Sequence, residues 1–200
     1  MRFTRASALI PVWIVACVQC PPAHGQWRVG AEVGSERFWG ASTDTAGGGP
    51  SLRPYRPTSF GIGVARQAGR WDAGLRFRYL SASLALEGTE GLVAVKGIFD
   101  VYGAAALLAY RVARIAANEL TLEAGPLLEI WSVAGEESRT RLGLQVGASL
   151  KVPLGAGLLG SLTAGAAVMP SPFTESQLDA GFQRRALWRR RLAGGLEIRL

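Results

Sequence analysis

The residue types that most often carry nucleophilic or metal chemistry are Cys17, Cys20 and His24, and all three lie near the N-terminus. Thiolate and imidazole groups at short spacing serve as metal ligands or as a nucleophile with its base. The rest of the 200-residue chain contains neither Cys nor His. Any thiol, disulfide or Cys/His metal chemistry therefore depends on whether this segment stays in the protein.

Residues 1–25 have the composition of a secretory signal peptide. Two arginines are followed by an apolar stretch at residues 6–16 and by the small residues Ala23 and Gly25. These small residues occupy positions −3 and −1 of a cleavage site before Gln26. We therefore expect export and loss of both Cys and the single His.

One alternative stays open within this segment. The run that ends in Cys17 resembles a lipoprotein box, in which Cys17 would be acylated and become the first residue. With cleavage before Gln26, the chain divides into a signal peptide at 1–25 and one domain at 26–200. The remaining 20 basic and 15 acidic residues lower the net charge from +7 to +5.

Two carboxylate pairs could do general acid–base work, Glu136 with Glu137 and Glu175 with Asp179. Both pairs fall between the predicted strands, where solvated loop charges are the simpler interpretation. We expect no enzyme, no catalytic residue, no cofactor and no metal site.

The strongest basic feature surrounds Trp188 and consists of Arg184, Arg185, Arg189, Arg190 and Arg191. In isolation it suggests nucleic-acid binding. Arginine forks also match the oxygens of lipid phosphates. The location of this cluster in the fold determines whether nucleic acid or lipid phosphate is the expected partner.

Composition excludes a disordered chain, because 48% of the residues are hydrophobic and only 18% are charged. No apolar run reaches the roughly 18–20 residues of a membrane-spanning helix. The apolar residues instead alternate with polar residues, most clearly over 139–152, where nearly every even position is apolar and every odd position is polar, charged or Gly. A period of two is typical of a strand with one apolar face.

The alternation predicts eight strands, at about 27–34, 60–65, 71–79, 92–112, 120–128, 139–152, 156–169 and 191–200. The fourth and seventh are rich in Ala and Gly, and residues 104–117 are the best helix candidate in the chain. The number and spacing of their neighbours favour strands. The predicted connections alternate between short and long, with tight turns at 68–70 and 153–155 and the longest loops at 41–57 and 170–184. The predicted fold is an all-β, eight-stranded antiparallel up-and-down barrel.

Alternation alone does not tell a soluble lipocalin-like barrel from a membrane barrel. The polar face carries Gly alternating with charge, which suits a narrow interior with internal ion pairs. The predicted interior charges are Arg28, Glu32, Asp72, Arg76, Arg78, Arg111, Glu123, Glu129, Arg139, Arg141, Lys151, Arg191, Glu197 and Arg199. Eight strands leave room only for side chains, so we expect a plugged interior and not a channel.

The positions of the aromatic residues favour a membrane barrel over a soluble one. Trp27 and Trp71 open their strands on the apolar face, and Trp39, Tyr79 and Trp188 share that face at the opposite ends. The 12 residues from Trp27 to Trp39 span roughly 30 Å of height in a tilted strand. Two such belts are the aromatic girdles expected at membrane interfaces.

The end of the chain adds a resemblance. Gly195, Ile198 and Leu200 resemble the C-terminal insertion signal of outer-membrane barrels, although Leu200 replaces the usual aromatic residue. Residues 26–200 resemble the small eight-stranded outer-membrane barrels, the family of the outer-membrane protein A transmembrane domain. The resemblance is architectural and implies an outer-membrane location and the barrel-assembly machinery as a partner during insertion. Barrel enzymes that edit lipid A need a His, which residues 26–200 lack.

The sequence therefore predicts a non-enzymatic outer-membrane protein, most simply a monomer, with a structural or surface-binding role and no nucleic-acid partner. Lipopolysaccharide phosphates are the expected partner of an Arg-rich outer rim. Its predicted members are Arg53, Arg56, Arg184, Arg185, Arg189 and Arg190. Two alternatives remain: passage of small or hydrophobic solutes across the membrane, and a soluble secreted ligand-binding barrel.

Overall fold

A computed structural model describes residues 26–44, 51–88, 91–133, 137–172 and 182–200. Side chains are described for 26–40, 57–83, 100–132, 137–172 and 185–200, and for the remaining described residues only the backbone is. The predicted signal peptide and the choice between cleavage before Gln26 and acylation of Cys17 lie outside these ranges. Among the residues described, no helix is long and apolar enough to cross a membrane.

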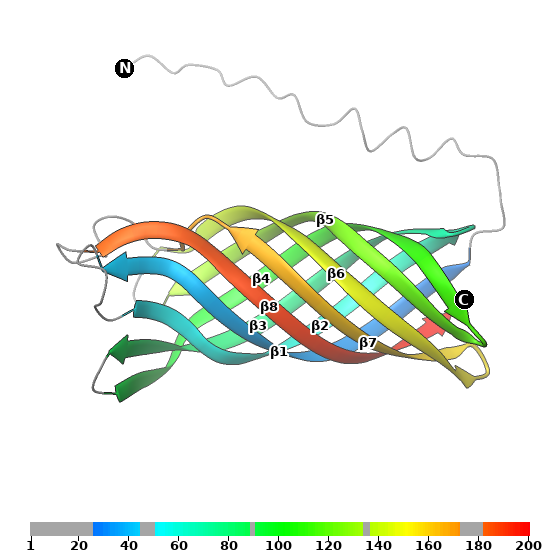
Figure 1. Cartoon of the computed structure of the whole chain (residues 1–200), viewed down its shortest axis with the longest axis horizontal. Helices are drawn as coiled ribbons and strands as arrows, with labels where there is room; N and C mark the ends of the chain where they lie inside the picture. The colour runs from blue at the N-terminus through cyan, green and yellow to red at the C-terminus, as the bar shows by residue number, and fades with distance from the viewer. Residues whose placement is uncertain (1–25, 45–50, 89–90, 134–136, 173–181) are drawn as a thin grey trace, which may run out of the picture.

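Eight antiparallel strands form one closed barrel in chain order, with β8 paired to β1 (Figure 1). Their bounds are β1 Trp27–Asp44, β2 Ser51–Ala68, β3 Trp71–Gly88, β4 Gly91–Ile115, β5 Asn118–Val133, β6 Arg139–Gly155, β7 Leu158–Met169 and β8 Phe182–Arg199. This confirms the predicted fold, including strands for the two Ala- and Gly-rich segments. The Leu200 amide donates to the Trp27 carbonyl at 2.8 Å, so both ends of the barrel domain meet at one end.

That end carries three two-residue turns, at 69–70, 116–117 and 156–157, and we call it the tight-turn end. The turn predicted at 153–155 is wrong, because β6 continues to Gly155. Pro153 is paired with Leu159, and a register shift follows it. Ala156 and Gly157 then take positive φ angles of 47° and 79°, which is the conformation that a tight hairpin needs.

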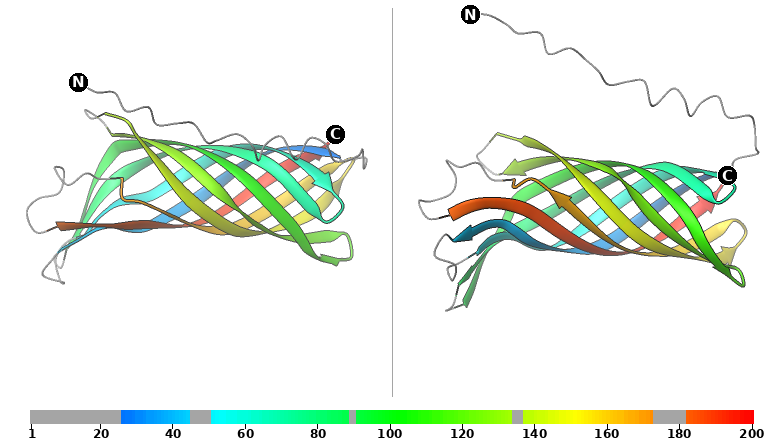
Figure 2. Two further views of the ribbon diagram at one scale, coloured as in Figure 1. Left: turned by 90° about the horizontal axis from the view of Figure 1, so that it is seen from above. Right: turned by 45° about the horizontal axis from the view of Figure 1, so that its top comes forward.

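The opposite end, which we call the loop end, has shorter connections than predicted. β1 runs to Asp44 and β2 begins at Ser51, so most of the predicted loop 41–57 is strand. β8 begins at Phe182, so residues 182–184 of the predicted loop 170–184 are strand as well. Strands on either side supply the backbone partners, as in the pair Asp44↔Phe182. Pairing therefore extends past the alternating segments (Figures 1 and 2). The strands have 12 to 25 residues, more than the about 9–11 that a strand needs to cross a membrane.

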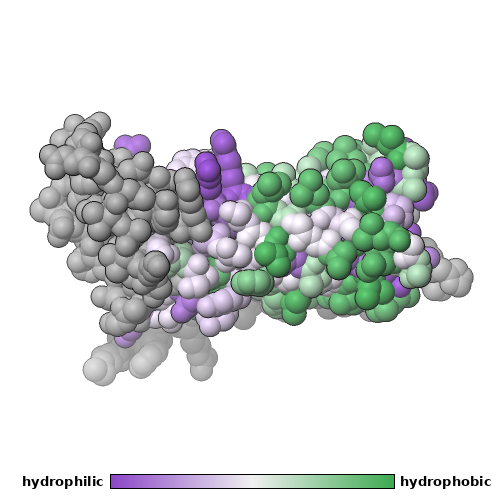
Figure 3. Space-filling model, turned by 90° about the horizontal axis from the view of Figure 1, so that it is seen from below, coloured by the Kyte–Doolittle hydropathy of each residue, from purple (hydrophilic) through white to green (hydrophobic). Residues whose placement is uncertain are grey.

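Over most of the barrel wall, apolar side chains face outward and most of the charged side chains face inward. Ile62 and Leu142 are 63% and 66% exposed, whereas Glu129 is fully buried. Figure 3 shows the resulting apolar surface over the half of the barrel nearer the tight turns, with polar surface toward the loop end. This arrangement is that of a membrane barrel, and it overturns the alternative of a soluble lipocalin-like barrel.

Several glycines face the lumen and leave room for charged side chains. A Cβ atom on Gly61 would lie 2.6 Å from Glu32 Oε1, and one on Gly147 would lie 3.2 Å from Glu123 Oε1. Part of the glycine excess of the sequence is therefore space for the interior charges.

We expect Gly61→Leu to destabilise the barrel by about 1–3 kcal/mol, because the new side chain displaces the Glu32 carboxylate. Gly194→Leu is the matched control, since a Cβ on Gly194 meets nothing within 4 Å. Urea unfolding of the refolded barrel in lipid vesicles measures both. Equal stability of the two variants would contradict the close packing at Gly61.

Candidate functional site

Charged side chains in the lumen form layers that begin near the tight turns. Glu119 binds Arg111 Nη1 at 3.2 Å and Arg199 Nη2 at 3.4 Å. Glu119 shares the inward parity of Thr121 and Glu123, but it lies one residue before Leu120, where the predicted strand begins. The alternation alone could have found it.

The next layer joins four strands. Arg28 binds Asp72 and lies 3.9 Å from Glu197, whose Oε2 accepts from Lys151 Nζ at 3.0 Å. Arg28 is almost fully buried, and a cavity of about 80 Å³ lies beside it. A buried arginine needs such partners, since an isolated charge here would cost several kcal/mol.

The middle layer centres on Arg76. Its guanidinium donates to Glu123 in a two-bond fork, with Nη1 at 2.6 Å and Nη2 at 2.9 Å, and its Nε lies 3.4 Å from Glu32 Oε1. Arg191 also binds Glu32. The fork sets the position of Arg76 and links β3 to β5 across the lumen.

Two arginines and two glutamates form the next layer, which we call the quartet: Glu36, Arg78, Glu129 and Arg189. Glu36 lies 3.3 Å from Arg78 Nη1 and 3.3 Å from Arg189 Nε. Both arginines also bind Glu129. No side chain of the quartet is more than 5% exposed.

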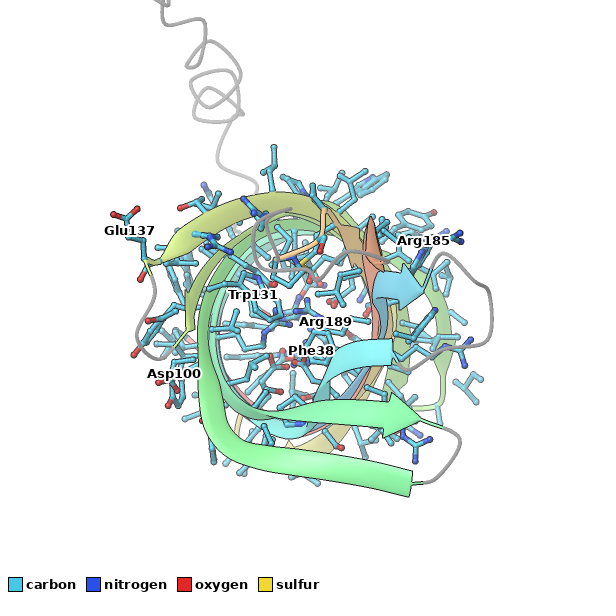
Figure 4. The ribbon with its side chains drawn as sticks, turned by 90° about the vertical axis from the view of Figure 1, so that its left-hand side faces the viewer. Phe38, Asp100, Trp131, Glu137, Arg185 and Arg189 are labelled. Atoms are coloured by element: carbon cyan, nitrogen blue, oxygen red, sulfur yellow. The ribbon has the colours of Figure 1, made fainter. Side chains whose placement is uncertain are left out.

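The quartet corrects one predicted site residue. Arg189 was assigned to the lipopolysaccharide-binding rim, but it lies inside the barrel beside Phe38 and Trp131 (Figure 4). Successive residues of a strand point to opposite faces, so Arg189 and Arg191 face inward while Arg190 faces outward. Arg189 therefore belongs with the interior charges.

An apolar cluster closes the lumen on the loop side of the quartet. Its buried members are Phe38, Leu80, Ala82, Val101, Ala105, Leu127, Trp131, Ala167, Met169 and Leu187. Phe38 and Trp131 pack edge to face with ring centroids 5.9 Å apart, and Trp131 Nε1–H donates to Glu129 Oε2 at 3.1 Å. This cluster, which we call the plug, lies inside the barrel at the level of Trp39.

The predicted interior residues Arg139 and Arg141 donate hydrogen bonds to backbone carbonyls. Arg139 Nη1 donates to the Pro172 carbonyl at 3.2 Å, and Arg141 Nε donates to the Ser171 carbonyl at 2.9 Å. Both arginines therefore hold the segment that follows β7 against β6.

The predicted girdle residues lie on the outer face. Trp27, Trp71, Tyr79 and Trp188 are all exposed, and Trp39 is half-buried because the Arg190 guanidinium stacks 4.9 Å from its ring centroid. Two further tyrosines extend the belts: Tyr110 packs against Trp71 and Tyr102 against Tyr79.

Near Trp39, two arginines face each other on the outer surface. Arg37 and Arg190 are register partners, and so are Trp39 and Trp188. We call these four residues the seam cluster. Within the described residues, no carboxylate pairs with either arginine. Like charges directly opposite on neighbouring strands repel, and a bound anion would remove that repulsion.

The other residues predicted for the lipopolysaccharide-binding rim have different outcomes. Arg185 is exposed and lies outside the wall (Figure 4). The backbone of Arg53, Arg56 and Arg184 belongs to β2 and β8, but their side chains lie outside the described set. Arg37 was missed, although its parity matches Trp39.

Of the carboxylates weighed for acid–base chemistry, Glu137 is exposed and points away from the barrel (Figure 4). Glu136, Glu175 and Asp179 lie outside the described residues. No group of three potential metal-binding His, Cys, Asp or Glu side chains occurs within the described ranges.

Comparison with solved structures identifies the fold. Neisserial surface protein A (NspA) matches with a TM-score of 0.56 and 13% identity, over 86% of this chain and 96% of that protein. The outer membrane protein OprG from Pseudomonas aeruginosa matches with a TM-score of 0.55 and 12% identity, over 88% and 96%. No protein-family model and no curated protein sequence matches the chain. The fold and the apolar belt confirm the predicted small outer-membrane barrel and its location.

Proposed function

We propose that this chain, which has the fold of the small eight-stranded outer-membrane β-barrels, is a non-enzymatic surface-binding protein that holds lipopolysaccharide phosphates at its outer rim. The observation that carries the proposal is the seam cluster. Arg37 and Arg190 oppose each other across β1 and β8 with no described carboxylate to separate them. A phosphate bound between the two guanidinium groups would accept hydrogen bonds from both.

The position of the cluster suits a lipid phosphate. Trp39 and Trp188 belong to the outer aromatic girdle, where indole rings lie at the level of lipid headgroups. Stacking of Arg190 on Trp39 restrains the guanidinium before a ligand binds. A preorganised arginine loses less conformational entropy on binding.

We expect Arg37→Gln/Arg190→Gln to weaken lipopolysaccharide binding about 10- to 100-fold, since glutamine replaces each charge-assisted hydrogen bond with a neutral one at a cost of roughly 1 kcal/mol per position. Binding is measured on the refolded barrel in detergent, with heat-modifiable gel migration as the check of folding. Arg66→Gln/Arg114→Gln, which removes two exposed arginines near the tight turns, is the matched control. Equal binding by both double variants would leave only a structural role.

Solute passage through the lumen is the competing function. The ion-pair layers and the plug obstruct the described part of the lumen and leave a cavity of only about 80 Å³ beside Arg28, so we expect no steady conductance when the wild-type barrel is reconstituted in planar bilayers. Liposome swelling with small sugars should match empty liposomes. Stable unitary conductance or swelling would favour passage over surface binding.

A further inference from the structure

The barrel wall has a notch where β7 ends, on the side of the loop end. This strand has 12 residues, whereas β6 has 17 and β8 has 18. Pairing of β7 stops at Leu144↔Val168 on one side and at Met169↔Leu187 on the other. Beyond these pairs, β6 and β8 continue toward the loop end without β7 between them.

The segment 170–172 closes the inner side of this notch. Pro170 and Pro172 have no N–H group, so they cannot continue a backbone ladder. Arg139 and Arg141 reach across from β6 to the carbonyls of Pro172 and Ser171, and Ser171 is buried. The wall is thereby closed with side chains, which leaves a depression on its outer surface.

This depression is an apolar groove of about 760 Å³. Its lining includes Leu142, Leu144, Val168, Pro170, Arg185 and Ala186. Val168 is the register partner of the girdle residue Trp188, so the groove lies at the outer interface of the membrane. Arg185 is the single charged residue among the described residues that line it, and no described carboxylate pairs with it.

We propose that this groove binds one acyl chain of a phosphate-bearing lipid of the outer leaflet, with the lipid phosphate on Arg185. The inference deepens the proposed function and rests on it for the class of ligand, but it uses different residues. The volume lies in the range of small-ligand sites, and the apolar lining with one polar contact is typical of them. When an acyl chain fills the groove, the phosphate of the same lipid lies at its edge and stabilises the positive charge there.

The test uses the full barrel refolded in detergent and native mass spectrometry, with dioleoyl phosphatidic acid, dioleoylglycerol and inorganic phosphate as probes. Val168→Phe/Ala186→Phe fills the groove from β7 and β8. The control Leu162→Phe/Ala164→Phe places the same side chains on the outer face of β7, outside the groove. Heat-modifiable migration shows whether each variant has folded.

We expect the groove variant to bind phosphatidic acid about tenfold more weakly and the control to bind within about twofold of wild type. Arg185→Gln should remove the preference for phosphatidic acid over dioleoylglycerol. Unchanged binding by the groove variant, equal loss in the control, or inorganic phosphate binding as tightly as phosphatidic acid would each overturn the inference.

The experiments can contradict either proposal without contradicting the other. If Arg37→Gln/Arg190→Gln retains lipopolysaccharide while the groove variant loses phosphatidic acid, the seam cluster is wrong and the groove stands. If the arginine variant loses lipopolysaccharide while the groove variant binds phosphatidic acid normally, only the groove is wrong.

Discussion

Glu129→Leu is expected to destabilise the barrel by about 3–5 kcal/mol, because it leaves Arg78 and Arg189 with one carboxylate between them. Neither guanidinium can reach water, since both side chains are buried in the quartet. Leucine also removes the acceptor of the Trp131 indole N–H. Urea unfolding in lipid vesicles, followed by gel migration, measures the loss.

Two controls separate charge imbalance from loss of packing. Replacing all four residues of the quartet with Leu or Met should leave stability within about 2 kcal/mol of wild type, because no uncompensated charge remains. Glu137→Leu, at an exposed position, should change nothing measurable. A Glu129→Leu barrel as stable as wild type would contradict the need for balanced charge in the lumen.

The same reasoning applies, with smaller effects, to the middle layer. Glu32→Leu and Glu123→Leu should each destabilise the barrel, but Arg76 keeps one carboxylate in either variant. The expected losses are about 1–3 kcal/mol, measured by the same unfolding assay. A neutral effect of both substitutions would contradict the role of these ion pairs.

Alternation predicted the fold because odd and even residues of a strand face opposite sides of the sheet. Once one residue is assigned to the lumen, the side of every other residue in that strand follows. The interior positions of Arg28, Glu32 and Asp72 follow from it. The same rule predicts Glu36 and Phe38, which were missed because the outward neighbours Ser35 and Arg37 are polar. Here β1 leaves the apolar belt, so alternation between apolar and polar residues disappears although the strand continues.

Other features depend on relations between strands. Arg76 of β3 pairs with Glu123 of β5 and Glu32 of β1, so its partners depend on strand stagger across the lumen. Nothing in one strand's sequence specifies that stagger. The notch could be predicted only in part from the sequence. Pro170 and Pro172 mark where β7 must end, but the groove exists only because β6 and β8 extend further.

The plug provides the second large expected effect, since Trp131 is the largest fully buried side chain of the described residues. Trp131→Ala should destabilise the barrel by about 3–5 kcal/mol, because the cavity left beside Phe38 cannot be refilled by lipid. Trp188→Ala is the matched control. Trp188 is 46% exposed on the outer face, where lipid chains refill the space, so its loss should be clearly smaller.

Trp131→Phe separates packing from hydrogen bonding at this site. Phenylalanine keeps most of the contact with Phe38 but has no N–H to donate to Glu129 Oε2, so we expect about 1–3 kcal/mol of the loss to persist. In the quartet-to-Leu background the acceptor is absent, and Trp131→Phe should then cost less than in wild type. Because the two residues touch, their effects are expected to be non-additive. An additive result in urea unfolding would mean that the indole stabilises the plug by packing alone.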